Sequence, residues 1–152
     1  MYAPLCANLD AVNDFYLAVE AKLVRGDPTQ ISYGLMFRIA GINFDRYYFF
    51  QFREDKLYNL LFWDGSKYKD IIHWSSTNAV KLGKFNRLEI VAIGSVFYFY
   101  INGQDLGHTE DNNLKLGQVG LSVGSGASGE EAVVDFKNFE LRRKPSDLPP
   151  KN

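Results

Sequence analysis

Residues 86–103 read NRLEIVAIGSVFYFYING, and this stretch indicates a β-hairpin. Apolar side chains such as Leu88 and Ile90 recur at every second position on both sides of Gly94-Ser95, which is the period of an extended strand. Asn102-Gly103 then ends the second strand, because both residues tolerate the positive φ of a type I′ turn. The stretch therefore predicts antiparallel strands at residues 87–93 and 96–101, with a third strand after the second turn.

The same alternation runs through most of the chain from Asp14 onward, and no segment shows the 3.6-residue period of a helix. We expect about ten strands, at residues 15–23, 33–39, 46–54, 57–63, 68–74, 87–93, 96–101, 104–109, 117–123 and 133–141. Short strands at this spacing, separated by turn residues, are typical of two packed sheets. The predicted fold class is all-β, a two-sheet antiparallel jelly roll.

The alternation also predicts which side chains are buried. The expected core consists of Phe15, Leu17, Leu35, Phe37, Phe50, Phe52, Leu88, Ile90, Phe97, Phe99, Leu121 and Phe136. The apolar spacing slips by one residue between Phe136 and Phe139, which predicts a β-bulge in the last strand. Several strands are apolar on their second face as well, and this surplus indicates a groove or a contact with a partner.

Three segments are expected along the chain. Residues 1–13 form an N-terminal lead-in, residues 14–142 the jelly-roll domain, and residues 143–152 a Pro-rich linker or tail that holds three of the five prolines. The tail favours a domain that is covalently part of a larger chain. Cys6 is the single cysteine and lies among apolar residues, which is typical of a small buried hydrophobe rather than a nucleophile.

Charge and hydropathy exclude two classes of partner. The chain carries 17 Lys and Arg against 18 Asp and Glu, which gives a net charge of −1. A nucleic-acid binder usually carries a basic excess, so no nucleic acid is expected as a partner. No apolar run approaches the roughly 20 residues that span a bilayer, so no membrane insertion is expected.

The strand and turn phrases resemble a known superfamily. They include Ile72-His73-Trp74-Ser75, Asn86-Arg87-Leu88-Glu89-Ile90, Phe99-Tyr100-Ile101-Asn102-Gly103 and Val134-Asp135-Phe136-Lys137-Asn138-Phe139. Over residues 14–141 the sequence resembles the concanavalin A-like lectin/glucanase superfamily, and within it the laminin G-like bacterial modules related to the 3-keto-disaccharide hydrolase domain family. The resemblance implies a jelly roll in an extracytoplasmic bacterial protein, with a glycan as partner. Fold transfers well between such relatives, and function transfers badly.

Polar and aromatic residues on the second strand faces are the candidates for ligand binding. A sugar is bound by an aromatic ring on its apolar face and by Arg or amide side chains at its hydroxyls. Alternation places six such residues opposite the predicted core: Arg38, Tyr47, Gln51, Arg53, Tyr98 and Tyr100. They form one groove if their strands are neighbours in one sheet. Trp63 and Trp74 end strands near turns; a place in the core is favoured for both, and an exposed place at the ligand surface stays open.

Calcium is a weaker possibility. Asp105 and Asp111 lie in a stretch rich in Asp and Asn, whose oxygens can bind calcium. Neither residue fits the twelve-residue EF-hand pattern, and Asp and Asn are also common turn formers. The turn interpretation is favoured, so no cofactor and no other metal are expected.

Catalysis is not favoured. The retaining glucanases of this superfamily carry Glu-x-Asp-x-x-Glu, or a close variant, on one strand, and this sequence has no such run. Glu89 stands alone in its strand, and Lys22 occupies the position two residues after Glu20. The predicted function is therefore a non-catalytic carbohydrate-binding module. Two alternatives remain open: a sugar hydrolase with carboxylates from different strands, and a spacer or protein-interaction domain without a small ligand.

Overall fold

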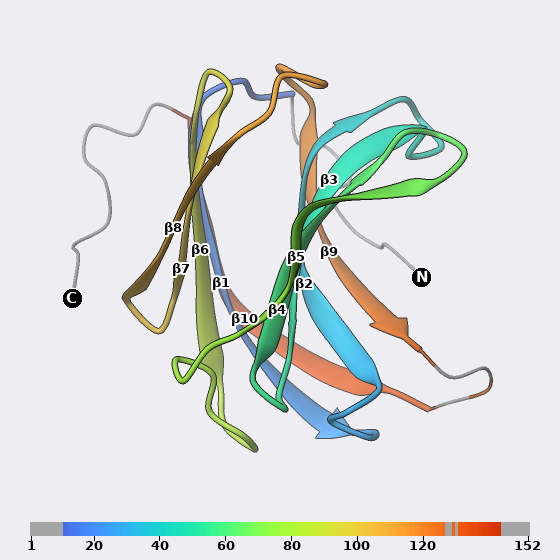
Figure 1. Cartoon of the computed structure of the whole chain (residues 1–152), viewed down its shortest axis with the longest axis vertical. Coiled ribbons are helices and arrows are strands. Elements are labelled where there is room, and N and C mark those ends of the chain that lie inside the picture. The colour runs from blue at the N-terminus through green and yellow to red at the C-terminus, as the bar shows by residue number, and fades with distance from the viewer. Residues whose placement is uncertain (1–10, 127–128, 130, 144–152) are drawn as a thin grey trace.

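The structure is a computed structural model, and it describes residues 11–126, 129 and 131–143. In these residues the chain forms ten strands and no helix, arranged as two facing sheets (Figure 1). The strands are β1 (Phe15–Arg25), β2 (Ile31–Ala40), β3 (Arg46–Arg53), β4 (Leu57–Trp63), β5 (Tyr68–Ser76), β6 (Asn86–Ile93), β7 (Val96–Ile101), β8 (Gln104–Glu110), β9 (Gln118–Ser125) and β10 (Val133–Arg142). Each of them overlaps a predicted strand.

The two sheets have five strands each and are antiparallel. The β1 sheet has the order β10-β1-β6-β7-β8, and the β3 sheet has the order β5-β4-β3-β2-β9. The chain changes sheet between β1 and β2, between β5 and β6, between β8 and β9, and between β9 and β10. This arrangement is the predicted antiparallel jelly roll, so the fold-class prediction is confirmed.

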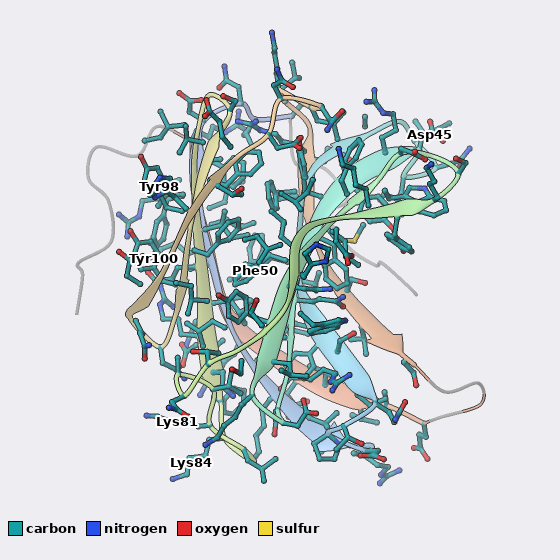
Figure 2. The ribbon with its side chains drawn as sticks, in the orientation of Figure 1. Asp45, Phe50, Lys81, Lys84, Tyr98 and Tyr100 are labelled. Carbon is teal, nitrogen blue, oxygen red and sulfur yellow. The ribbon has the colours of Figure 1, made fainter. Side chains whose placement is uncertain are left out.

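Aromatic side chains join the two sheets. The ring centroid of Phe50 in β3 lies 4.8 Å from that of Phe99 in β7, and Phe37 in β2 lies 5.1 Å from Phe97 in β7. Figure 2 shows Phe50 in the space between the sheets. Ten of the predicted core residues are fully buried there, namely Phe15, Leu17, Leu35, Phe37, Phe50, Phe52, Leu88, Ile90, Phe97 and Phe99. Leu121 and Phe136 are partly buried against the same core.

Two local predictions are also confirmed. Asn102 and Gly103, which join β7 to β8, have φ angles of 52° and 78°, as a type I′ turn requires. In β10 one extra residue separates the partners of Ala18 and Glu20 of β1, and Asn138 has a φ of 54°. This β-bulge explains the slip in the apolar spacing before Phe139.

The described part of the chain contains no helix that is long and apolar enough to cross a membrane. Val12, within the predicted lead-in, is buried and pairs with Gly117 in an isolated antiparallel bridge. Cys6 and most of the predicted tail lie outside the described residues.

Replacement of Phe99 by Ala tests how much the aromatic packing between the two sheets stabilises the fold. Phe99 is fully buried and contacts Phe50 of the other sheet, so its loss leaves a cavity between the sheets. We expect the free energy of unfolding to fall by about 3–5 kcal/mol in chemical denaturation. Phe139→Ala is the matched control, because Phe139 is exposed and its loss is expected to cost about 0.5 kcal/mol or less. Equal effects of the two substitutions would contradict this assignment of the core.

Candidate functional site

The outer face of the β3 sheet gathers three of the six predicted site residues. Tyr48, Phe50 and Phe52 of β3 point into the core, so the alternate residues Tyr47, Gln51 and Arg53 point to the other side. The sequence prediction for the orientation of these three residues is therefore confirmed.

Strand β5 forms an aromatic wall beside this face. Leu60 of β4 pairs with Ile72 of β5, and Tyr58 of β4 pairs with Ser75 of β5. The same interval therefore spans two residues in β4 and three residues in β5. The extra residue is a β-bulge, and it moves the side chain of Trp74 off the core side. The expectation of a core position for Trp74 is wrong: its side chain is 41% exposed, and its ring lies beside Arg53.

Trp63 is also outside the core, which corrects the second tryptophan prediction. It pairs with Tyr47 across β4 and β3 and is partly buried. On this outer face it packs against an apolar cluster of Met36, Ile39, Tyr47 and Phe49. Its ring centroid lies 4.7 Å from that of Tyr68, the first residue of β5.

A groove of about 360 Å³ crosses the outer face of the β3 sheet. On one side its described lining comes from β5 and β3. On the other side it comes from β2, β9, the turn before β2 and the turn after β9. The lining residues are Gln30, Ser32, Gln51, Arg53, Tyr68, Trp74, Gly124, Ser125 and Gly126. The groove therefore combines two exposed aromatic rings with amide, hydroxyl and guanidinium groups.

Arg53 is held by a carboxylate and by an aromatic ring. Its Nε donates to Oδ1 of Asp55 at 3.0 Å, and its Nη2 donates to Oδ2 at 2.7 Å. The guanidinium carbon lies 5.1 Å from the ring centroid of Trp74. Because the guanidinium is planar, the paired carboxylate and the indole together fix its orientation.

Two amide side chains of the β3 sheet have unmet hydrogen-bonding capacity. Gln51 and Asn59 are cross-strand partners in β3 and β4 and are 4% and 1% exposed. Neither Oε1 of Gln51 nor Oδ1 of Asn59 accepts a hydrogen bond. A buried acceptor without a donor is costly. Both oxygens are almost completely covered by protein atoms, so a ligand in the groove reaches them only if the side chains move.

Tyr47 and Tyr68 are linked at their hydroxyl groups, whose oxygens lie 2.9 Å apart. Burial and this hydrogen bond raise the pKa of Tyr47 well above its ordinary value. Tyr47 therefore stays protonated at neutral pH and is unsuited to act as a base.

The prediction for Arg38 is wrong, because its side chain is fully buried between the sheets. Its Nη1 donates to the backbone carbonyl of Leu114 at 2.9 Å, and its Nη2 donates to that of Asn13 at 3.0 Å. The guanidinium lies 4.9 Å from the ring centroid of Phe97 in the core. Burial lowers the pKa of Arg38. Arg38 joins the β8–β9 connection to the start of β1 and does not contribute to the groove.

A β-bulge explains the orientation of Arg38. Phe37 of β2 pairs with Tyr48, whereas Ala40 pairs with Arg46, so β2 has one more residue than β3 in this interval. Arg38 takes the left-handed conformation with a φ of 51°. The bulge turns Arg38 inward and Ile39 outward, which reverses the alternation expected from the sequence.

Tyr98 and Tyr100 lie on the opposite side of the molecule, on the outer face of the β1 sheet (Figure 2). They pack there with Tyr16, Ala18 and Val91. The single groove with all six predicted residues therefore does not exist. The condition for it, that the strands are neighbours in one sheet, fails because β3 and β7 belong to different sheets.

Glu89 is a buried carboxylate on this opposite face. Tyr16 donates its hydroxyl hydrogen to Oε2 of Glu89 at 2.5 Å, and Nη2 of Arg87 donates to the hydroxyl oxygen of Tyr16 at 3.1 Å. Burial and the bond to Glu89 raise the pKa of Tyr16 to about 12. The hydroxyl of Tyr100 has no hydrogen-bond partner.

The two calcium candidates act as turn residues. Oδ1 of Asp111 accepts hydrogen bonds from the hydroxyl of Tyr48 and from the backbone and side chain of Asn113. Oδ1 of Asp105 accepts one from the backbone of Gly107 at 2.7 Å. Within residues 11–126, 129 and 131–143, no three His, Cys, Asp or Glu side chains gather as metal ligands would.

Sequence reasoning missed the groove-lining residues Gln30, Ser32, Tyr68, Gly124, Ser125 and Gly126. It also missed Asn59, the cross-strand partner of Gln51. Asn59 and Tyr68 could have been found from the sequence, because alternation places this amide and this aromatic ring on strand faces opposite the core. The positions of Gln30 and Ser32 beside the groove follow from the pairing of β2 with β9, which no local pattern reveals.

A family model matches most of the chain. The model of the 3-keto-alpha-glucoside-1,2-lyase-like domain matches residues 4–142. This finding confirms the resemblance drawn from the sequence. No curated protein matches the chain.

Solved structures with the same fold are only distantly similar in sequence. The carbohydrate-binding module CBM66 from Bacillus subtilis is 19% identical with a TM-score of 0.71, over 87% of this chain and 76% of that one. A putative glycosyl hydrolase from Parabacteroides distasonis is 13% identical with a TM-score of 0.61, over 90% and 75%. Sheep galectin-11 is 11% identical with a TM-score of 0.57, over 84% and 95%. At these identities the likeness shows the fold alone.

Replacement of Arg38 by Ala tests its structural role. The substitution removes a buried side chain and leaves the carbonyls of Leu114 and Asn13 without their donors. We expect the free energy of unfolding to fall by about 2–4 kcal/mol in urea denaturation. A surface role for Arg38 would instead leave the unfolding midpoint unchanged.

Alkaline pH tests the environment of Tyr16. Its pKa is about 12 in the folded protein and about 10 in an unfolded chain. Its contribution to stability is therefore complete below pH 10 and is lost as the pH rises through 12. We expect the stability of Tyr16→Phe to fall less steeply than that of the unmodified protein between pH 10 and 12. Parallel curves of unfolding free energy against pH would contradict the raised pKa.

Proposed function

The chain belongs to the 3-keto-alpha-glucoside-1,2-lyase-like domain family, and on that premise we propose that it is a non-catalytic carbohydrate-binding module. The glycan binds in the groove on the outer face of the β3 sheet. The module works in an extracytoplasmic bacterial protein, where polysaccharides and glycoconjugates are present. The folds of CBM66 and galectin-11 are consistent with this role.

One observation carries the proposal: two exposed aromatic rings and several polar side chains line one groove. Tyr68 and Trp74 are each 41% exposed and line the groove together with Gln51. An indole or phenol ring covers the apolar face of a pyranose, and the hydroxyls at the edge of that sugar can donate to amide oxygens. A shallow site of this kind supports weak binding, with a Kd in the range of about 1 mM to 1 μM.

The chemistry of the groove argues against catalysis. Its described lining includes no carboxylate and no imidazole, and Asp55 beside it is paired with Arg53. Glycoside hydrolysis needs two carboxyl groups on either side of one bond, and an elimination needs a base. Tyr47 beside the groove is a poor base, because its pKa is raised.

The alternative is an enzyme of the hydrolase or lyase type, which the family description favours. Two buried carboxylates, Glu54 and Glu89, are the natural candidates for it. Glu54 accepts hydrogen bonds from the backbone of Leu23 and Gly83 and from the hydroxyl of Tyr33 in the core. Glu89 lies on the outer face of the other sheet. The two carboxylates cannot stand on either side of one sugar bond.

A panel of disaccharides, 3-keto sugars and polysaccharides tests the absence of catalysis. We expect no turnover when the protein is incubated with each of them and the products are separated by chromatography. Turnover that is lost in Glu54→Gln or Glu89→Gln would contradict the non-catalytic proposal and support the enzyme.

A glycan array tests binding, and Trp74→Ala locates the site. We expect the unmodified protein to bind at least one glycan, and Trp74→Ala to weaken that binding about tenfold or more, because the stacked ring is lost. The melting temperature should change little, since Trp74 is exposed.

Tyr98→Ala is the matched control for Trp74→Ala. It also removes an aromatic ring from an outer face, but from the β1 sheet, and its binding should equal that of the unmodified protein. Weaker binding by Tyr98→Ala alone would place the site on the opposite face. An array without any bound glycan would favour the spacer or protein-interaction domain.

A further inference from the structure

We propose that the groove selects uncharged sugars over acidic ones, because Asp55 neutralises the guanidinium of Arg53. This inference rests on the proposed function and specifies its ligand as a neutral, hydroxyl-rich sugar. Two contacts of Arg53, which lines the groove, lead to it: the bidentate pair with Asp55 and the ring of Trp74.

The ion pair removes the cation that would attract an acidic sugar. Both oxygens of Asp55 are within hydrogen-bond distance of Arg53, at 3.0 and 2.7 Å, so the pair is bidentate and has no net charge. The side chains are 23% and 25% exposed, so both lie in partly desolvated surroundings. A ligand carboxylate that approaches Arg53 meets the negative charge of Asp55 and cannot replace it without breaking two charge-assisted bonds.

The indole of Trp74 further restricts access to Arg53. The guanidinium carbon lies 5.1 Å from the ring centroid, so one face of the cation is covered. Arg53 therefore acts as a positioning residue for Trp74 more than as an anion receptor. The Arg53–Asp55 pair, which has no net charge, therefore holds the indole of Trp74 in place.

The rest of the described lining supplies no second cation. Apart from Arg53, the polar side chains that line the groove are uncharged: Gln30, Ser32, Gln51, Tyr68 and Ser125. Their amide and hydroxyl groups can exchange hydrogen bonds with the hydroxyls that neutral sugars and uronates both carry. Discrimination between the two classes therefore depends on the charge of Arg53.

A glycan array printed with neutral gluco-, manno-, xylo- and fructo-oligosaccharides, and with oligouronates of matched length, tests the selectivity. We expect the unmodified protein to bind neutral glycans and to leave the oligouronates unbound. Preferential binding of oligouronates would overturn this inference while supporting the proposed function. An array without any bound glycan would overturn both.

Asp55→Asn tests the mechanism of selection. The substitution keeps the size of the side chain and frees the charge of Arg53, so the ratio of oligouronate to neutral-glycan affinity should rise about tenfold, or about 1.4 kcal/mol. Asp135→Asn is the matched control, since it changes the net charge equally on β10 of the other sheet and should leave the ratio unchanged. An unchanged ratio in Asp55→Asn, or an equal rise in Asp135→Asn, would overturn the inference.

A double variant, Arg53→Gln with Asp55→Asn, separates charge from shape. It removes both charges, so the gain of oligouronate affinity seen in Asp55→Asn should disappear. The melting temperature of each variant, measured beside its binding, identifies any loss that comes from unfolding. Persistence of the gain in the folded double variant would overturn the role of Arg53.

Discussion

The packing of aromatic side chains between the sheets is the constraint on which the rest of the molecule depends. All strand-to-strand pairing occurs within one sheet or the other, so the sheets are held together by side chains such as Phe50 against Phe99 and Phe37 against Phe97. This packing uses one face of every central strand. Only the outer faces and the ends of the sandwich remain for a ligand, and the groove lies on one of those outer faces.

β-bulges determine which side chains depart from the regular alternation of inward and outward positions along a strand. The bulge in β2 turns Arg38 into the core, where two backbone carbonyls and the ring of Phe97 surround its guanidinium. The bulge in β5 turns Trp74 away from the core and toward Arg53. One irregularity therefore removes a polar residue from the surface, and the other supplies the groove with an aromatic ring. Both are single-residue insertions, and β5 has a second one, between the partners of Leu60 and Leu61.

The groove combines rigid and polar parts in a way that suits weak recognition of sugars. Gln51 lies on β3, a central strand whose backbone is paired with β2 on one side and β4 on the other. Trp74 and Tyr68 stand on the edge strand β5, where more of each ring is exposed. Because Arg53 is paired with Asp55, the polar chemistry of the site is that of neutral groups. We propose that selectivity comes from this pairing rather than from a free charge.

The sequence by itself determined the all-β class, the positions of the strands, the type I′ turn at Asn102-Gly103 and most of the core, because these depend on local alternation and turn chemistry. It also placed Tyr47, Gln51 and Arg53 on one face. The tertiary structure alone decided that Tyr98 and Tyr100 lie on the opposite side, since the assignment of β3 and β7 to different sheets depends on long-range pairing. It also decided the positions of Arg38 and Trp74, because a bulge is set by the register against a neighbouring strand and not by the residues of one strand.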